Sequence, residues 1–281
     1  MKTFISALLM ALLISAAAHA AEPLRYDKGV VDTDTTWSGT VFVKGQTVVK
    51  KGATLTVLPG AVVKFEWSDE DNDGIGDGEL NVEGKLIAKG TKDNMITFTS
   101  AKDSPAQKDW TFLMISVNKG SLVEYCIFEY AFSGVQVHYS TATIRNNLFR
   151  HNFEGVRFST TNVNIEHNDF IGNEYGIRYE SRGSQTGIND NIFRDNDYAF
   201  FPVQKCSDTV RVSGNNITSA NYNVKMGDNQ RDDLDYTGNW WGTTEPAAIE
   251  AGFFDGRKDG SIGKVIYEPA LDGPAPGCGI L

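Results

Sequence analysis

The chain contains 281 residues, with 26 Lys and Arg against 36 Asp and Glu, which gives a formal net charge of −10. This acidic balance argues against nucleic acid, or any anionic polymer held by overall charge, as the partner, because such binding needs a basic surface. Chains of this length form one or two domains, and a repeat protein can reach it as a single unit. We expect one domain.

The first twenty residues have the composition of a secretory signal peptide. Lys2 is followed by an apolar run over residues 4–18 and then by Ala18-His19-Ala20. A basic start, a short hydrophobic core and an Ala-x-Ala site are the three parts of such a peptide, which would be removed after Ala20. The run is short for a membrane anchor, and no later stretch reads as a membrane span. We predict an exported protein, located in the periplasm, outside the cell or at its surface.

Short strands with alternating apolar and polar residues begin at residue 37. Turns rich in Gly separate them over residues 37–65, and the pattern continues over residues 79–100. Alternation bounded by turn residues predicts β-strands with one buried face. We expect residues 21–36 to cap the open end of this array, since an uncovered strand edge would leave backbone groups unpaired.

An Asp-rich stretch interrupts these strands. Acidic residues occupy relative positions 1, 3, 5 and 9 counted from Asp69, and Gly74 stands at position 6. This spacing matches the first part of a calcium loop, in which hard oxygen ligands surround Ca²⁺ and the glycine allows a sharp turn. Leu80 stands at position 12, where an EF-hand places Glu, so the alternative is a solvated loop. The expected ligands of a structural Ca²⁺ are Asp69, Asp71, Asp73, Asp77 and the carbonyl group of Ile75.

The pattern apolar-x-x-Asn-x-aromatic recurs six times between residues 123 and 241. Its central positions are separated by 21, 21, 23, 24 and 24 residues. A period of this size is typical of a solenoid, and each period holds short strand patterns rather than the long 3.6-residue periodicity of a helix. The copies are Val123/Cys126/Phe128, Ile144/Asn147/Phe149, Ile165/Asn168/Phe170, Ile188/Asn191/Phe193, Val212/Asn215/Ile217 and Tyr236/Asn239/Trp241.

Stacking one circuit of strands per period would place equivalent residues over one another, about 4.8 Å apart. The central asparagines would then form an inward ladder that bonds along the stack and to turn backbone, beside a column of core Phe side chains. In these repeats the sequence resembles the secreted bacterial right-handed parallel β-helix proteins of the pectin-lyase-like superfamily. The resemblance implies an all-β, single-stranded right-handed parallel β-helix over residues 37–270, with about nine coils and capped ends.

The C-terminal part of the sequence first continues the repeat and then departs from it. Asn239-Trp240-Trp241-Gly242 resembles a motif that commonly closes bacterial β-helices. A short capping helix is expected over residues 246–254 and a last strand over 265–269, followed by a Pro/Gly-rich tail over 271–281. Cys206 and Cys278 would tie this tail down if they paired in an oxidising compartment, and the sequence leaves that pairing open.

A second signature, Gly134-Val135-Gln136-Val137, recurs in phase with the first. If its apolar residues point inward, the residues between them point outward and stack. This surface suits a polysaccharide or cell-surface glycan, with cations for uronate carboxylates and Phe201, Tyr139 or Tyr175 for stacking; the alternative is an ordinary solvated face. The outward column comprises Gln136, Arg157, Arg178, Phe201 and Lys225, and the next outward position carries His138, Ser159 and Glu180.

No catalytic constellation is evident on this surface. The resemblance implies that a lyase would hold Ca²⁺ with several carboxylates beside a basic residue, and inverting hydrolases need two carboxyl groups about 6.5–9.5 Å apart. We therefore predict a non-catalytic exported protein, structural, adhesive or glycan-binding. The alternative is a polysaccharide lyase, hydrolase or epimerase acting on an acidic glycan. Its candidate residues are the cations Arg157, Arg178 and Lys225 and the proton carriers Glu180 and His138, with Asp190, Asp195 and Asp197 together in one coil.

Overall fold

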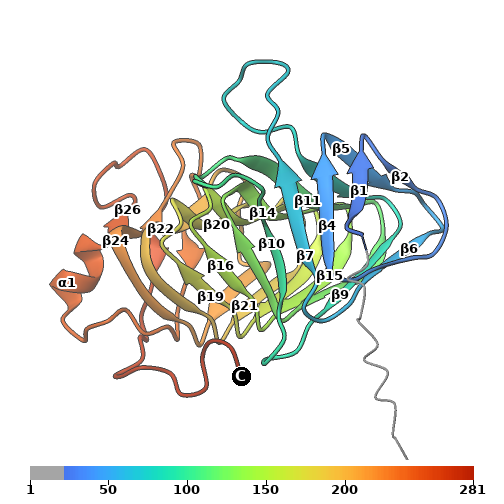
Figure 1. Ribbon diagram of the computed structural model, residues 1–281. Helices are drawn as coiled ribbons and strands as arrows, with labels where there is room; N and C mark the ends of the chain where they lie inside the picture. Colours follow the sequence, from blue (N-terminus) through green and yellow to red (C-terminus); the bar gives the residue numbers. More distant parts are fainter. Residues whose placement is uncertain (1–21) are drawn as a thin grey trace, which may run out of the picture.

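The computed structural model describes residues 22–281, so the expected signal peptide of residues 1–20 lies outside the described residues. The chain winds into a solenoid of stacked coils (Figure 1). Among the residues described, no helix has the length and apolar character that a membrane span requires. The strands pair in parallel from coil to coil, which confirms the predicted right-handed parallel β-helix.

Each regular coil contributes one strand to each of three faces. The first face is a sheet of eight strands. It consists of β3 (Thr35–Trp37), β6 (Thr54–Val57), β9 (Lys85–Lys89), β12 (Lys119–Glu124), β15 (Thr141–Arg145), β18 (Asn162–Glu166), β21 (Thr186–Asn189) and β23 (Val210–Ser213). The second face consists of β1 (Leu24–Asp27), β4 (Thr40–Lys44), β7 (Val62–Glu66), β10 (Ile96–Ser100), β13 (Cys126–Glu129), β16 (Leu148–Arg150) and β19 (Asp169–Ile171), continued by β22 and β24.

The third face carries the outward column of the second signature. It consists of β2 (Val30–Val31), β5 (Gln46–Val49), β8 (Glu79–Val82), β11 (Trp110–Ser116), β14 (Ala131–His138), β17 (Glu154–Ser159), β20 (Tyr175–Glu180), β22 (Ile192–Pro202), β24 (Asn216–Lys225) and β26 (Phe253–Phe254). Because β22 and β24 run through both the second and third faces, these faces form one sheet of 17 strands. The helix α1 (Pro246–Ala251) and the paired β25 (Leu234–Asp235) and β27 (Val265–Ile266) lie at the C-terminal end (Figure 1).

Two asparagine ladders turn the chain between faces. In the first ladder each side-chain amide nitrogen donates to the amide oxygen of the next coil, at 2.9 Å from Asn147 to Asn168 and 3.0 Å from Asn168 to Asn191. The same oxygen of Asn168 accepts the backbone N–H of Asn147 at 3.0 Å, so buried turn backbone is satisfied. The first ladder comprises Asn147, Asn168, Asn191, Asn215 and Asn239, and the second comprises Asn152, Asn173 and Asn196.

Aromatic side chains stack beside the ladders and fill the core. Phe128, Phe149 and Phe170 are fully buried, and their ring centroids lie 5.0 and 4.9 Å apart. The predicted inward ladder and core column are both confirmed. Cys126 occupies the first ladder position as a buried thiol, and its backbone N–H donates to Asn147 at 2.8 Å.

The two ends of the solenoid differ. Residues 22–36 contain β1, β2 and the start of β3, and they form the first coil, in which the ring of Tyr26 lies 5.1 Å from that of buried Trp37. At the other end the tail returns along the corner before the first ladder. Its Gly279 N–H donates to Asp190 O at 2.8 Å, and Cys278 donates to Gly214 O at 3.0 Å. All three cysteines are free, so the disulfide left open by the sequence is not formed.

Candidate functional site

The outer face, formed by the outward side chains of β14, β17, β20, β22 and β24, carries the column expected from the second signature. Gln136, Arg157, Arg178 and Phe201 are register partners on successive coils. Lys225 extends the column, with Nζ 5.8 Å from the ring centroid of Phe201. Gln136 is itself buried, at 5% exposure, so the accessible part of the column begins at Arg157.

The proposed proton carriers lie in the neighbouring column but do not touch each other. Ser159 stands between His138 and Glu180 in the register. The ring of His138 contacts Ser159 Oγ at 3.1 Å and Gln136 Oε1 at 3.3 Å. Burial, aided by the charge of Arg157, lowers the pKa of His138. Glu180 forms an ion pair with Arg182, so neither group is paired for acid–base catalysis.

A row of six aromatic rings runs beside this column along the solenoid axis. Successive ring centroids lie 5.0, 5.5, 5.1, 6.3 and 5.8 Å apart. The sequence pattern pointed to Tyr175 and not to the others, although the three tyrosines stand one position before the second signature in successive coils. We call Phe132, Phe153, Tyr175, Tyr198, Tyr222 and Phe254 the aromatic row.

Glycine explains why Tyr175 faces outward. At Gly134 the register of β11 against β14 shifts by one residue, so this glycine and the following Val135 both face the core. A Cβ at the equivalent Gly155 would lie 2.7 Å from Gly176 O and 2.9 Å from the Phe170 ring. The bulge therefore turns the residue before each glycine outward, and in β20 that residue is Tyr175.

A buried carboxylate supports the cations of the outer face. Glu154 is fully buried, accepts a hydrogen bond from Ser133 Oγ, and pairs with Arg178 at 2.7 Å. This fixes the Arg178 guanidinium group 5.6 Å from the Phe201 ring centroid. Lys225 Nζ lies 4.7 Å from the Tyr198 ring centroid. The sequence pattern did not identify Glu154. The alternation of apolar and polar residues places it on the outward side of its strand but does not show that its side chain is buried.

The three aspartates of one coil lie at two different corners. Asp190 lies at the first ladder's corner, 3.9 Å from the ring nitrogen of His167. Asp195 has a positive φ of 58° at the second ladder's corner and lies 3.5 Å from Arg194. Asp197 flanks the same ladder residue, Asn196, on its other side.

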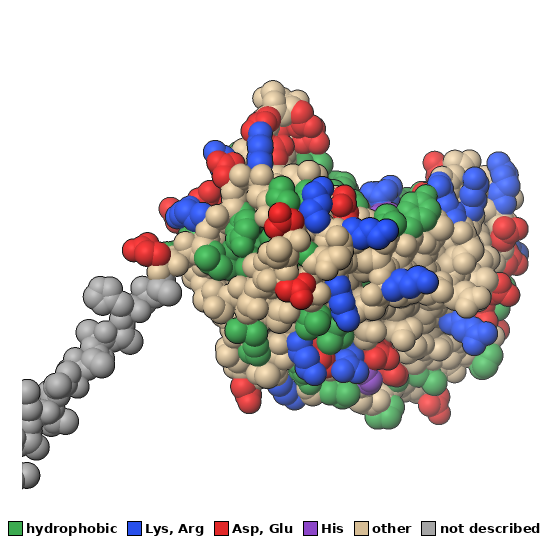
Figure 2. All heavy atoms as spheres, turned by 90° about the vertical axis from the view of Figure 1, so that its right-hand side faces the viewer, with side chains coloured by type: hydrophobic (Ala, Val, Ile, Leu, Met, Phe, Trp, Pro, Cys, Tyr) green, Lys and Arg blue, Asp and Glu red, His purple; other side chains and the backbone are tan. Residues whose placement is uncertain are grey.

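The Asp-rich stretch forms a loop between β7 and β8 that projects from the solenoid (Figure 1), and acidic side chains gather on this projection (Figure 2). Oxygen atoms of Asp69, Asp71 and Asp73 all lie within 4.8 Å of one another. Asp69 also accepts the backbone N–H groups of Asp73 and Gly74 at 3.1 Å. The carboxylate of Asp77 instead accepts the N–H of Glu70 at 3.0 Å. Three of the four expected carboxylate ligands are thus brought together.

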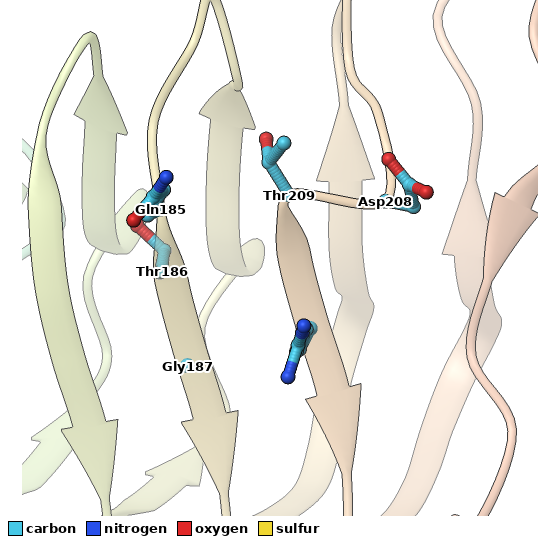
Figure 3. Close-up of a pocket in the computed structure, with 6 residues that line it drawn as sticks. Gln185, Thr186, Gly187, Asp208 and Thr209 are labelled. Atoms are coloured by element: carbon cyan, nitrogen blue, oxygen red, sulfur yellow. The ribbon is translucent and has the colours of Figure 1, made fainter.

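A hollow of about 480 Å³ lies on the first face, at β21 and β23 (Figure 3). It opens over Gly187, where the outward column between Asn164 and Arg211 lacks a side chain. Gln185, Asp208 and Thr209 line its rim. Its lining contains no aromatic ring and no residue singled out from the sequence.

Among known proteins, the chain matches a family model but no individual curated protein or solved structure. A family model described as "Periplasmic copper-binding protein (NosD)" matches residues 34–254, which span the β-helix from its first coil to β26. The family is periplasmic, in agreement with the predicted export. The match covers most of the chain, and the chain therefore belongs to the NosD family.

Proposed function

We propose that this periplasmic β-helix is a non-catalytic, glycan-binding protein of the cell envelope that holds an acidic sugar chain on its outer face. The observation that carries the proposal is the alignment of Arg157, Arg178, Phe201 and Lys225 on successive coils beside the aromatic row. Rings offer stacking surfaces to sugars, and guanidinium and ammonium groups bind carboxylates. Parallel strands repeat these groups about every 4.8 Å along the axis, so a chain molecule lying along the solenoid would meet them in succession.

Local charge supports an anionic ligand despite the net charge of −10. Within residues 22–281, neither Arg157 nor Lys225 has a carboxylate within ion-pairing distance, whereas Glu154 is neutralised by Arg178. Unpaired cations at a partly desolvated surface attract anionic groups more strongly than overall charge repels them, because salt screens charges separated by more than about 8–10 Å.

The ion pairs and hydrogen bonds of two acidic groups on the outer face argue against catalysis. Glu154 is held by Ser133 and Arg178, and Glu180 is held by Arg182. The lyase, hydrolase or epimerase alternative retains two supporting observations. The pKa of His138 is lowered by burial beside the basic column, and burial, with smaller contributions from the charges of Asp197 and Glu154, raises the pKa of Glu174.

The decisive experiment is a glycan array followed by titration with polygalacturonate. We expect micromolar binding by the wild-type protein and a loss of about tenfold in affinity for Arg157→Ala, equivalent to one charge-assisted contact of about 1.4 kcal/mol. Arg211→Ala, on the first face, is the matched control and should bind as wild type. Absence of binding to every acidic glycan would refute the proposal, and release of reducing ends in a parallel assay would establish the enzymatic alternative.

The family description names copper, and the side chains of this chain offer few ligands for it. Copper sites use imidazole, thiolate and thioether groups. His138 lies on the outer face, while His151 and His167 occupy the corners before the two ladders, with φ of 56° and 54°. His167 and Cys278 lie near the same carboxylate, Asp190, but they are not part of a group whose ligand atoms lie within 4.8 Å of one another.

The thiols fit copper no better. Cys126 and Cys206 are both buried in the described structure, and burial raises the pKa of each thiol. Met226 is buried in the core. The one cluster of close ligand atoms in the described chain, at Asp69, Asp71 and Asp73, offers hard oxygen atoms, which suit Ca²⁺. The described His, Cys, Asp and Glu side chains therefore do not assemble a copper site, and we propose structural Ca²⁺ binding by the Asp-rich loop instead.

A further inference from the structure

The outward column of the third face carries charge only in its middle part. The strand register extends it in both directions, so that it comprises Asn81, Met114, Gln136, Arg157, Arg178, Phe201, Lys225 and Phe254. Five of these eight side chains are uncharged. The charge that a ligand meets along this column therefore comes from Arg157, Arg178 and Lys225.

Arg178 does not act as a free cation. Its Nη1 atom pairs with Glu154 Oε1 at 2.7 Å, and Glu154 is fully buried. Opposite charges at this distance largely cancel in the field that a third group feels. The Arg178 side chain is 26% exposed and has further N–H groups, so it can donate to an uncharged acceptor such as a sugar hydroxyl group.

Phe201 separates this ion pair from the last cation of the column. Its ring centroid lies 5.2 Å from that of Tyr175, so the column meets the aromatic row here. Lys225 Nζ lies 5.8 Å from the same Phe201 centroid. A carboxylate placed against the Phe201 ring would lose water without gaining a hydrogen bond, which is unfavourable.

Two free cations thus flank a section of the column without net charge. Neither Arg157 nor Lys225 forms an ion pair with a carboxylate of residues 22–281. They stand three coils apart in the column, which corresponds to about 14 Å because parallel strands lie about 4.8 Å apart. The column presents its free positive charge at two separated points.

Charges beside the column do not fill this gap. In the neighbouring column Glu180 pairs with Arg182. Beside the aromatic row, burial raises the pKa of Glu174, and the charges of Lys108 and Lys225 oppose that shift, so Lys108 lies near a carboxylate. Within the described chain, the uncharged section therefore gains no further unopposed cation.

We propose that the outer face selects glycans whose carboxylates are separated by uncharged sugar rings, over glycans with a carboxylate on every ring. Arg157 and Lys225 bind two separated carboxylates, while Arg178 and Phe201 contact the uncharged rings between them. Glu154 is a positioning residue, since it holds Arg178 and cancels its charge. The inference rests on the proposed glycan-binding function and adds the class of sugar chain that the surface prefers.

Calorimetric titration with two oligosaccharides of equal length tests this selection. In hyaluronate glucuronate alternates with uncharged N-acetylglucosamine, whereas in oligogalacturonate every ring carries a carboxylate. The wild-type protein should bind the hyaluronate oligomer about threefold to tenfold more tightly. Non-specific attraction predicts the opposite order, because oligogalacturonate carries about twice the charge.

Two variants should shift the preference towards oligogalacturonate. Glu154→Gln removes the buried charge and leaves Arg178 as a free cation. Phe201→Lys adds an ammonium group to the uncharged section. Each variant should raise the affinity for oligogalacturonate, relative to that for hyaluronate, about threefold or more.

The matched control is Glu129→Gln on the second face. Glu129 accepts a hydrogen bond from Thr99 Oγ1 at 2.9 Å and pairs with Arg150 at 2.7 Å, so it has the same kinds of partner as Glu154. This change should leave the ratio of the two affinities as in the wild type. Phe201→Lys alters an outward side chain, and it decides the matter if Glu154→Gln does not fold, as judged by its melting temperature.

Glycan binding itself can survive a negative result. If the wild-type protein binds both oligomers without preferring hyaluronate, or if the folded variants leave the ratio unchanged, the selection for spaced carboxylates is wrong and glycan binding stands. If neither oligomer binds, the selection falls together with the proposed function.

Discussion

Asn168 shows how much one residue can carry in a stacked fold. Its amide oxygen accepts two hydrogen bonds from Asn147, and its amide nitrogen donates to Ile144 O and to Asn191, all within a fully buried corner. No outward polar residue of the same strands has such a set of partners. Asn168 therefore stabilises the fold mainly through hydrogen bonds to polar groups of the neighbouring coils.

Replacing Asn168 by Leu should therefore be severe. The change leaves at least three buried polar groups unpaired, each costing about 1–3 kcal/mol, so we expect a loss of about 3 kcal/mol or more in the free energy of unfolding, measured by urea denaturation. Asn164→Leu, the same substitution at an exposed position of β18, and Arg157→Ala should both stay within about 0.5 kcal/mol. Equal small effects in all three would contradict the inward ladder.

His138 gives a pH-dependent contribution to stability. Its folded-state pKa is lowered mainly by burial, so between that value and the unfolded value of about 6.5 the unfolded chain binds more protons. Stability is then lost as the pH falls below about 6.5. We expect the urea midpoint of the wild type to drop more than that of His138→Gln between about pH 7 and pH 5; parallel curves would show that the ring titrates equally in both states.

At the level of the element, the Asp-rich loop combines a preformed cluster with a connection to its neighbour. Because Gly76 donates to Lys108 O and accepts from Thr111 Oγ1 at 2.6 Å, order in this loop is shared with residues 101–109. The close approach of three carboxylates is unfavourable without a cation, since like charges repel. Ca²⁺ would relieve that repulsion in the native state alone.

Calcium should accordingly stabilise the protein. Ligand at about one hundred times its Kd adds about 2.7 kcal/mol when it binds only the folded state, so we expect a higher melting temperature with Ca²⁺ and a return to the lower value with chelator. Asp71→Asn should abolish the difference, whereas Asp93→Asn, at an exposed turn, should preserve it. If calorimetric titration with Ca²⁺ shows no heat, the loop does not bind the ion and is only a solvated connection between β7 and β8.

The elements also show what a sequence can reveal. The ladder was predictable because stacking converts a tertiary contact into a fixed spacing, as from Asn147 to Asn168. The aromatic row was mostly missed because the bulge at Gly134 breaks the simple alternation from which outward residues were counted. Glu154 could not be recognised as a buried carboxylate, since its partner Arg178 lies on the next coil and reaches it only through the fold.

For the whole molecule, the parallel stack brings residues distant in sequence to one surface while leaving the core uniform. The core repeats in every coil, with rings such as Phe149 and Phe170 7° apart in plane, and it carries no functional information. The distinctive residues lie on the third face and on the loops that bound it. Function in such a fold is therefore determined by the loops that leave the coils and by the outward-facing side chains. The repeat determines only the spacing of these groups.

One further property follows from the first ladder. The side-chain bonds from rung to rung all run in the same sense, from Asn147 towards Asn239, so the amide oxygens all face the N-terminal end. The second hydrogen of each amide bonds to a backbone carbonyl of the preceding coil. Aligned dipoles of this kind add along their axis, as they do in an α-helix, and neighbouring bonds polarise one another. A molecule built from near-equivalent coils thereby acquires an internal electrical direction, with its negative pole beside Cys126.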